Sequence, residues 1–174
     1  QESLVRDTSW AMPAFVKADS INPILVAGDN SFFCPIRKEP VLWEEKDVFN
    51  PAAVVREGKV FLLYRAEDKI GKYAGTSRIG LATSEDGLHF TKMKNPVFYP
   101  DNDSLKVFEW EGGVEDPRVV ETEDGKYFMT YTAYDGTTAR LYINCELKNT
   151  VSQGGLTFNN PDDLFIGKTF AAAF

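Results

Sequence analysis

Short runs of alternating, β-branched and aromatic residues recur along the chain, and few windows show a helical period. Tight turns are predicted where an acidic residue precedes glycine, at 57–58, 86–87, 124–125 and 135–136. Between such turns we expect six β-strands, at residues 52–55, 60–64, 78–83, 118–120, 126–133 and 139–144. The pattern therefore predicts an all-β protein.

Two segments of the chain repeat one another. The first reads Phe-Asn-Pro from residue 49 and Gly-Lys-Val-Phe-Leu-Leu-Tyr from residue 58. The second reads Glu-Asp-Pro from residue 115 and Gly-Lys-Tyr-Phe-Met-Thr-Tyr from residue 125, so the offset from Asn50 to Asp116 is 116 − 50 = 66 residues. Multi-stranded repeats lengthened by loops are typical of β-propeller blades. The chain is therefore predicted to be part of a β-propeller.

This repeat also predicts how the chain is organised. We expect a single partial domain over 1–174, with an N-terminal arm at 1–44, a first repeat at 45–110, a second repeat at 111–150 and an aberrant tail at 151–174. Two repeats cannot close a ring, and an open propeller leaves strand edges unpaired. We therefore expect a truncated product or a shifted reading frame near the end. The first residue is not methionine, which favours a processed, periplasmic or secreted protein and leaves a cytoplasmic one open.

Propeller geometry points to a candidate pocket. The innermost strand of each blade begins near the central axis, so Asn50 and Asp116 are expected at equivalent places beside it. We expect the proline that follows each of them to hold it in an extended conformation. Arg65 and Asp68 close the first inner strand, and Arg78 lies at the start of the next one. The sequence therefore predicts that these side chains gather in one pocket.

Composition excludes several classes of function. Nineteen Lys and Arg against 26 Asp and Glu give a net charge of −7, which lacks the basic patch of a nucleic-acid or anionic-membrane binder. No apolar stretch approaches the roughly 20 residues that span a bilayer. The single histidine, His89, argues against a histidine-built metal site. Cys34 and Cys145 have no CxxC spacing, which favours free thiols over a disulfide.

The densest group of titratable residues lies at 109–118. Four carboxylates fall within eight positions there, next to two glycines that would let a ligand approach the backbone. Crowded carboxylates raise one another's pKa, which suits a proton donor at neutral pH. Arg118 would add a planar fork for an anionic or hydroxylated group. A solvated acidic loop is the simpler alternative.

Four motifs in order carry a resemblance to a known family. They are Val-Phe-Asn-Pro-Ala-Ala at 48–53, Leu-Tyr-Arg-Ala-Glu-Asp at 63–68, Ser-Arg-Ile-Gly-Leu-Ala-Thr-Ser-Glu-Asp-Gly at 77–87 and Gly-Gly-Val-Glu-Asp-Pro-Arg at 112–118. Together they resemble glycoside hydrolase family 130 over roughly residues 22–141. That family groups phosphorylases and hydrolases of β-mannosides on a five-bladed β-propeller. The resemblance implies that this chain is an incomplete N-terminal portion of about two blades.

The resemblance also implies residue roles. Asp116 would be the proton donor to the glycosidic oxygen, relayed in the phosphorylases through a mannosyl hydroxyl. Six residues would bind substrate: Asn50, Arg65, Asp68, Arg78, Glu115 and Arg118. Asp68 and Arg118 are equally explained as structural ion-pair partners. The partner would be an oligosaccharide, with no metal and no cofactor, inorganic phosphate being a co-substrate in a phosphorylase; association into a homo-oligomer is left open.

Several functions remain open from the sequence. The family's phosphate-binding or base residues come from later blades, so only the acid half of an inverting cleavage can be assigned here. The non-methionine start favours hydrolysis over phosphorolysis. Other classes are a sugar-binding module without catalysis, a five-bladed glycosidase acting on arabinan or xylan through three carboxylates, and a truncated gene product with no function of its own.

Overall fold

The computed structural model describes residues 16–135, 138–143 and 146–152, and within them the chain is almost entirely β-strand. The predicted all-β class is therefore confirmed. Cys145 and most of the predicted tail at 151–174 lie outside the described residues. No helix among the described residues is long and apolar enough to cross a membrane.

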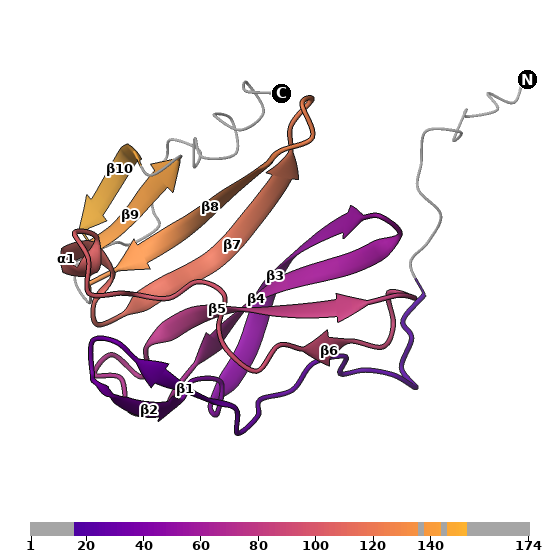
Figure 1. Cartoon of the computed structure of the whole chain (residues 1–174), viewed down its shortest axis with the longest axis horizontal. Helices are drawn as coiled ribbons and strands as arrows, with labels where there is room; N and C mark the ends of the chain where they lie inside the picture. The colour runs from indigo at the N-terminus through magenta and orange to yellow at the C-terminus, as the bar shows by residue number, and fades with distance from the viewer. Residues whose placement is uncertain (1–15, 136–137, 144–145, 153–174) are drawn as a thin grey trace, which may run out of the picture.

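Eight strands form two blades of four strands each, one blade for each repeat (Figure 1). The first contains β3 (Asp47–Arg56), β4 (Lys59–Glu67), β5 (Ser77–Ser84) and β6 (Thr91–Lys92). The second contains β7 (Gly113–Glu121), β8 (Tyr127–Tyr134), β9 (Thr138–Ile143) and β10 (Glu146–Ser152). Consecutive strands within each blade pair antiparallel, as they do in β-propellers. One parallel pair of residues, Ser77 of β5 with Gly113 of β7, joins the two blades into a continuous sheet.

The turn between β3 and β4 shows how local sequence sets the strand register. Arg56 pairs with Lys59, which leaves a two-residue loop of Glu57 and Gly58. Both loop residues have positive φ, 51° and 77°, as a type I′ hairpin turn requires. The predicted turn at 57–58 is therefore present, and it determines which residues of β3 face β4.

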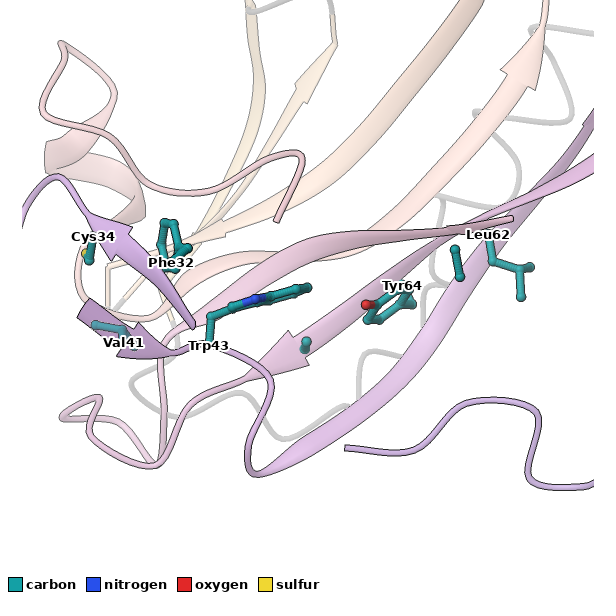
Figure 2. Close-up of a cluster of buried hydrophobic side chains, with 8 residues drawn as sticks. Phe32, Cys34, Val41, Trp43, Leu62 and Tyr64 are labelled. Carbon is teal, nitrogen blue, oxygen red and sulfur yellow. The ribbon is translucent and has the colours of Figure 1, made fainter. Parts of the chain in front are cut away.

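A short hairpin precedes the first blade and completes its core. It is made of β1 (Ser31–Cys34) and β2 (Glu39–Leu42), which the sequence pattern did not predict. Eight buried residues form the core cluster: Phe32, Cys34, Val41, Trp43, Leu62, Tyr64, Ala66 and Ala82. Figure 2 shows the Trp43 ring pointing from the end of the hairpin toward Tyr64 of the blade, and the two ring centroids are 6.1 Å apart. Part of the predicted N-terminal arm is thus packed into the blade.

A second buried cluster holds the two blades together. It joins Ile79 of β5, Val114 of β7, and Tyr131 and Ala133 of β8, each at most 9% exposed. Phe98 packs edge-on against Tyr131 with centroids 4.8 Å apart. α1 (Lys106–Glu109), a single helical turn, lies just before β7 and contacts β8. The contact between blades is therefore apolar, and it places β3 and β7 close to one another.

The first strand of each blade has a β-bulge at the same place. One extra residue is inserted between Phe49 and Ala52, and again between Glu115 and Arg118. Within these bulges Asn50 has φ 45° and Asp116 has φ 48°. The predicted extended conformation is therefore wrong, because the extra residue turns the backbone into the left-handed region, which Asn and Asp tolerate better than most residues.

Candidate functional site

The two bulges place equivalent residues of the two repeats against one another. The Asn50 side-chain amide donates a hydrogen bond from Nδ2 to Oδ1 of Asp116, with the atoms 2.8 Å apart. Because a bulge redirects the side chain of the residue it inserts, both side chains leave their own strands and meet between the blades. This contact joins residues that are 66 positions apart in the sequence.

One guanidinium lies at the centre of the site. Arg65 projects from β4, and its Nη1 is 3.2 Å from Oδ1 of Asp116. Its Nη2 is 2.6 Å from Oε1 of Glu67 and 2.8 Å from Oε1 of Glu115. Three carboxylates, two from β7 and one from β4, therefore surround a single positive charge.

Other groups fix the orientation of this arginine. Its Nε donates to the Ser77 hydroxyl at 3.0 Å, and its guanidinium lies over the Phe49 ring, 4.7 Å from the ring centroid. Lys46 lies on the far side of Glu67, with its Nζ 2.6 Å from Oε2. Arg65 is therefore held on several sides and has little freedom to rotate.

Burial and charge separate the pKa values of these carboxyls. Burial raises the pKa of Glu115 to about 7 against the opposing effect of Arg65, and Asp116 and Glu67 add to the rise. Burial also raises the pKa of Glu67, but the hydrogen bonds from Lys46 and Arg65 outweigh it and lower the pKa overall. Near neutral pH the site therefore holds a carboxyl that exchanges its proton next to one that stays ionised.

Asp116 is the most accessible carboxyl of the group. Its side chain is 36% exposed, against 15% for Glu115 and 11% for Glu67. Oδ1 accepts both hydrogen bonds described above, from Asn50 and Arg65. Among the described residues, Oδ2 has no hydrogen-bond partner. One oxygen is thus fixed by the protein, and the other is open to an incoming molecule.

Asp68 and Arg78 pair with each other away from this group. Their side chains are 0% and 1% exposed, and Arg78 Nη1 is 2.7 Å from Oδ2 of Asp68. The other oxygen of Asp68 accepts hydrogen bonds from three backbone amides of the β4–β5 loop: Ile70, Gly71 and Thr76. The pair anchors this loop, and a role of either residue in substrate binding stays a prediction.

Arg118 also lies apart from the central group. It is exposed on β7 beyond the bulge, and its Nη1 donates to the Pro117 carbonyl at 2.7 Å. It forms no ion pair with any residue that the structure describes. Its contact with substrate therefore stays a prediction.

The segment before β7 is held in place by the leading hairpin. Arg37, from the turn between β1 and β2, forms an ion pair with Glu111 and lies 5.2 Å from the centroid of the Trp110 ring. A Cβ on Gly113 would lie 2.2 Å from the Ser77 carbonyl oxygen, so this glycine serves close packing of the chain on itself. Its φ of 115° likewise favours glycine.

Sequence reasoning missed three neighbours of Arg65: Phe49, Glu67 and Ser77. For Glu67 a signal was present, because residues i and i+2 of a strand point to the same face, and Glu67 follows Arg65 by two. Ser77 pairs with Glu67 across β4 and β5, which depends on a register the loop between them does not reveal. In the described part of the chain, no group of three or more ligating side chains suits a metal ion.

Comparisons with known proteins agree with this architecture. The model of glycoside hydrolase family 130, described as beta-1,4-mannooligosaccharide phosphorylase, matches residues 32–153. Two curated proteins of Thermoanaerobacter sp. (strain X514) are similar to the chain. A 1,2-beta-oligomannan phosphorylase is 41% identical, covering 53% of this chain and 30% of the relative. A beta-1,2-mannobiose phosphorylase is 38% identical, covering 54% of this chain and 32% of the relative.

A solved structure extends the likeness over most of the chain. Its description states that the family of mannoside phosphorylases contains glycoside hydrolases that target beta-1,2 mannosidic linkages in Candida mannan. It superposes with a TM-score of 0.73 at 42% identity, covering 95% of this chain and 47% of that chain. This chain thus spans about a third of the curated relatives and under half of the solved structure.

The family match includes both blades and every residue of the Arg65 group. Structures of this family are five-bladed β-propellers, and the chain covers part of that fold. Because the match extends over more than half of the chain, the chain belongs to glycoside hydrolase family 130.

Proposed function

We propose that this chain supplies the proton-donating half of an enzyme that cleaves β-mannosides, with Asp116 as the general acid. The observation that carries the proposal is the state of the Asp116 carboxyl, which has one oxygen held by Asn50 and Arg65 and the other exposed without a partner in the described residues. The β-mannosides in the descriptions of its relatives support the substrate class.

The geometry suits donation of a proton to a departing sugar oxygen. The proton would sit on Oδ2, the oxygen without a partner among the described residues, and would pass to the glycosidic oxygen directly or through a sugar hydroxyl. Asp116 then becomes a carboxylate, and the hydrogen bonds from Asn50 and Arg65 stabilise the new charge on Oδ1. A positioned general acid of this kind contributes about 10²–10⁴-fold to the rate.

The reaction also needs a nucleophile on the opposite face of the sugar, either water or phosphate. The solved structure matches 95% of this chain and is described in connection with hydrolases, so hydrolysis is the first candidate. The two curated relatives are named phosphorylases, which makes phosphorolysis the second. All three descriptions name β-1,2 linkages, and we propose these as the bonds cleaved.

The test of the acid is Asp116→Asn in an otherwise complete enzyme. Asparagine tolerates the positive φ of this position and keeps an oxygen for Arg65, so the backbone should be preserved. We expect turnover of β-1,2-mannobiose to fall at least about 100-fold. Turnover of an aryl mannoside with a good leaving group should fall far less, because it needs little proton donation. Asp124→Asn, in the exposed β7–β8 turn, is the matched control. Equal turnover of both variants on mannobiose would remove Asp116 from the role.

A second assay separates the nucleophiles. The protein is incubated with β-1,2- and β-1,4-mannobiose, with and without phosphate, and mannose and mannose 1-phosphate are measured. Release of mannose alone, without phosphate, supports hydrolysis, and phosphate-dependent mannose 1-phosphate supports phosphorolysis. Binding of either disaccharide without turnover would instead favour the sugar-binding module.

A further inference from the structure

Lys46 reaches the group around Arg65 through a single carboxylate. Its Nζ lies 2.6 Å from Oε2 of Glu67, and the other oxygen of that carboxylate, Oε1, lies 2.6 Å from Nη2 of Arg65. Of the three carboxylates around Arg65, Lys46 pairs only with Glu67 in the described part of the chain. An effect of Lys46 on the site must therefore pass through Glu67.

We propose that Lys46 and Glu67 are positioning residues: Lys46 orients the Glu67 carboxylate, and Glu67 holds Arg65 where its Nη1 meets Asp116. The inference rests on the proposed role of Asp116 as the general acid. It gives this ion pair a part in the reaction that requires no contact with the sugar.

The backbone and the ammonium group of Lys46 are both fixed next to Glu67. The Lys46 amide donates to the Glu67 carbonyl at 3.0 Å, just before the first residue pair of β3 and β4. Its Nζ donates to Oε2 of Glu67 and to the Ala74 carbonyl in the β4–β5 loop. Rotating the carboxylate would break a charge-assisted hydrogen bond, which is among the stronger kinds. Oε1 is therefore kept facing Arg65.

The planar guanidinium transmits this orientation. Its nitrogens have a fixed geometry, so holding two of them sets the direction of the third. Nε donates to Ser77 at 3.0 Å, and Nη2 donates to Glu67 at 2.6 Å and to Glu115 at 2.8 Å. The bond from Nη1 to Asp116, at 3.2 Å, is the longest of the four. The place of Nη1 therefore depends on the shorter contacts, of which the one to Glu67 is the shortest.

A shift of Arg65 would affect the proton-donating step in particular. When Asp116 gives up its proton, Nη1 is one of the two donors that stabilise the new charge on Oδ1. A misplacement of about 1 Å in a catalytic site can cost about 100-fold in rate. The loss should be greatest for substrates whose departing oxygen needs a proton, whereas general damage to the fold would slow all substrates alike.

The first test is Lys46→Met in the complete enzyme, which keeps an unbranched apolar stem and removes the charge. We expect kcat for β-1,2-mannobiose to fall about 10-fold, and kcat for an aryl mannoside with a good leaving group to fall far less. Lys46→Arg restores a cation and should recover most of the loss. Lys59→Met, which removes a 2.6 Å ion pair with Glu85 from the same blade, is the matched control and should change neither rate. Equal losses on the two substrates in Lys46→Met would overturn the inference.

A double-mutant cycle tests whether Lys46 acts through Glu67. Glu67→Gln should also slow mannobiose more than the aryl mannoside, because the amide cannot hold Arg65 by charge. Adding Lys46→Met to Glu67→Gln should then cause little further loss, since interacting residues show non-additive effects. Losses that multiply in full would show that Lys46 acts by another route.

A readout without turnover separates the inference from the proposed function. The hydrogen on Nε of Arg65 is followed by ¹⁵N NMR, and its exchange with water should be faster in Lys46→Met than in the unaltered enzyme or in Lys59→Met. Unchanged exchange in Lys46→Met would overturn the inference. Full mannobiose turnover by Asp116→Asn would instead overturn the proposed function, while the exchange rate would still decide whether Lys46 holds Arg65.

Discussion

The two blades use one backbone frame to present opposite chemistry. Each first strand has a bulge with positive φ, yet the bulge residue is the amide Asn50 in one and the carboxylate Asp116 in the other. By strand register, Phe49 of the first blade corresponds to Glu115 of the second, and Arg65 corresponds to Thr132. The cation and the amide thus come from one blade, and two of the three carboxylates come from the other. Repeated architecture brings these groups together, and divergence at equivalent positions makes the site.

A second shared feature is a buried tyrosine–glutamate pair in each blade. Tyr64 donates to Oε2 of Glu44 at 3.0 Å, and Tyr131 donates to Oε1 of Glu109 at 2.7 Å. In the first blade, Lys92 adds an ion pair to Glu44 at 2.8 Å. Among the residues that the structure describes, no cation pairs with Glu109. The buried glutamate therefore has a cation beside it in the first blade, and none among the described residues in the second. Three measurements can test this difference.

The largest expected effect is that of Lys92→Met. It would leave Glu44, which is 0% exposed, without its cation, and breaking a buried ion pair costs about 3–5 kcal/mol. We expect the free energy of unfolding in urea at pH 7 to fall by about 3 kcal/mol. Lys126→Met removes a pair whose lysine side chain is 78% exposed, and should cost far less, because solvent screens an exposed ion pair. Equal losses for the two variants would show that Glu44 does not depend on Lys92.

The next effect concerns Glu109→Gln and depends on pH. Burial raises the pKa of Glu109 from 4.5 to about 7 in the folded chain, so the folded state binds a proton more tightly than the unfolded state. Its contribution to stability is therefore full below pH 4.5 and is lost as the pH rises through 7. Glutamine avoids this loss, so the variant should exceed wild type by up to about 3 kcal/mol at pH 8 and match it near pH 4.5. Glu44→Gln, measured alongside, should be destabilising at pH 8.

The smallest effect separates Tyr64→Phe from Tyr131→Phe. Each removes the hydrogen bond that the tyrosine donates to its buried glutamate, which is worth about 1 kcal/mol. Glu44 keeps Lys92 and Asn30, so Tyr64→Phe should cost less at pH 8 than Tyr131→Phe. The comparison is read from paired urea titrations at pH 5 and pH 8. A larger cost for Tyr64→Phe at pH 8 would show that the compensating groups of the first blade contribute little.

Long strands were predictable because their side chains follow a local rule. The alternation in β4 and β8 and the turn residues between strands depend only on neighbours in sequence. The hairpin of β1 and β2 was missed because each strand has four residues, and β2 contains Pro40, which weakens a strand pattern. Its stability comes from packing Phe32 and Trp43 against the first blade, which no local window contains.

The candidate site was predictable only in part. The repeat placed Asn50 and Asp116 at equivalent positions, and the motifs added Arg65 and Glu115. The sequence did not show that Asp68 and Arg78 would pair in a buried loop anchor. It also did not show that a bulge would turn Asn50 and Asp116 toward each other, because that depends on how two blades pack.

The sequence by itself determined the all-β class, the repeat and the residue types of the site, since these follow from local periodicity and from comparison of one segment with another. Tertiary structure alone decided which charges meet. A hydrogen bond between residues 66 positions apart, and a guanidinium shared by carboxylates of two blades, exist only because an apolar contact holds those blades side by side. The pKa of Glu115 is likewise a property of that packing, because burial and the approach of Arg65 are its main causes.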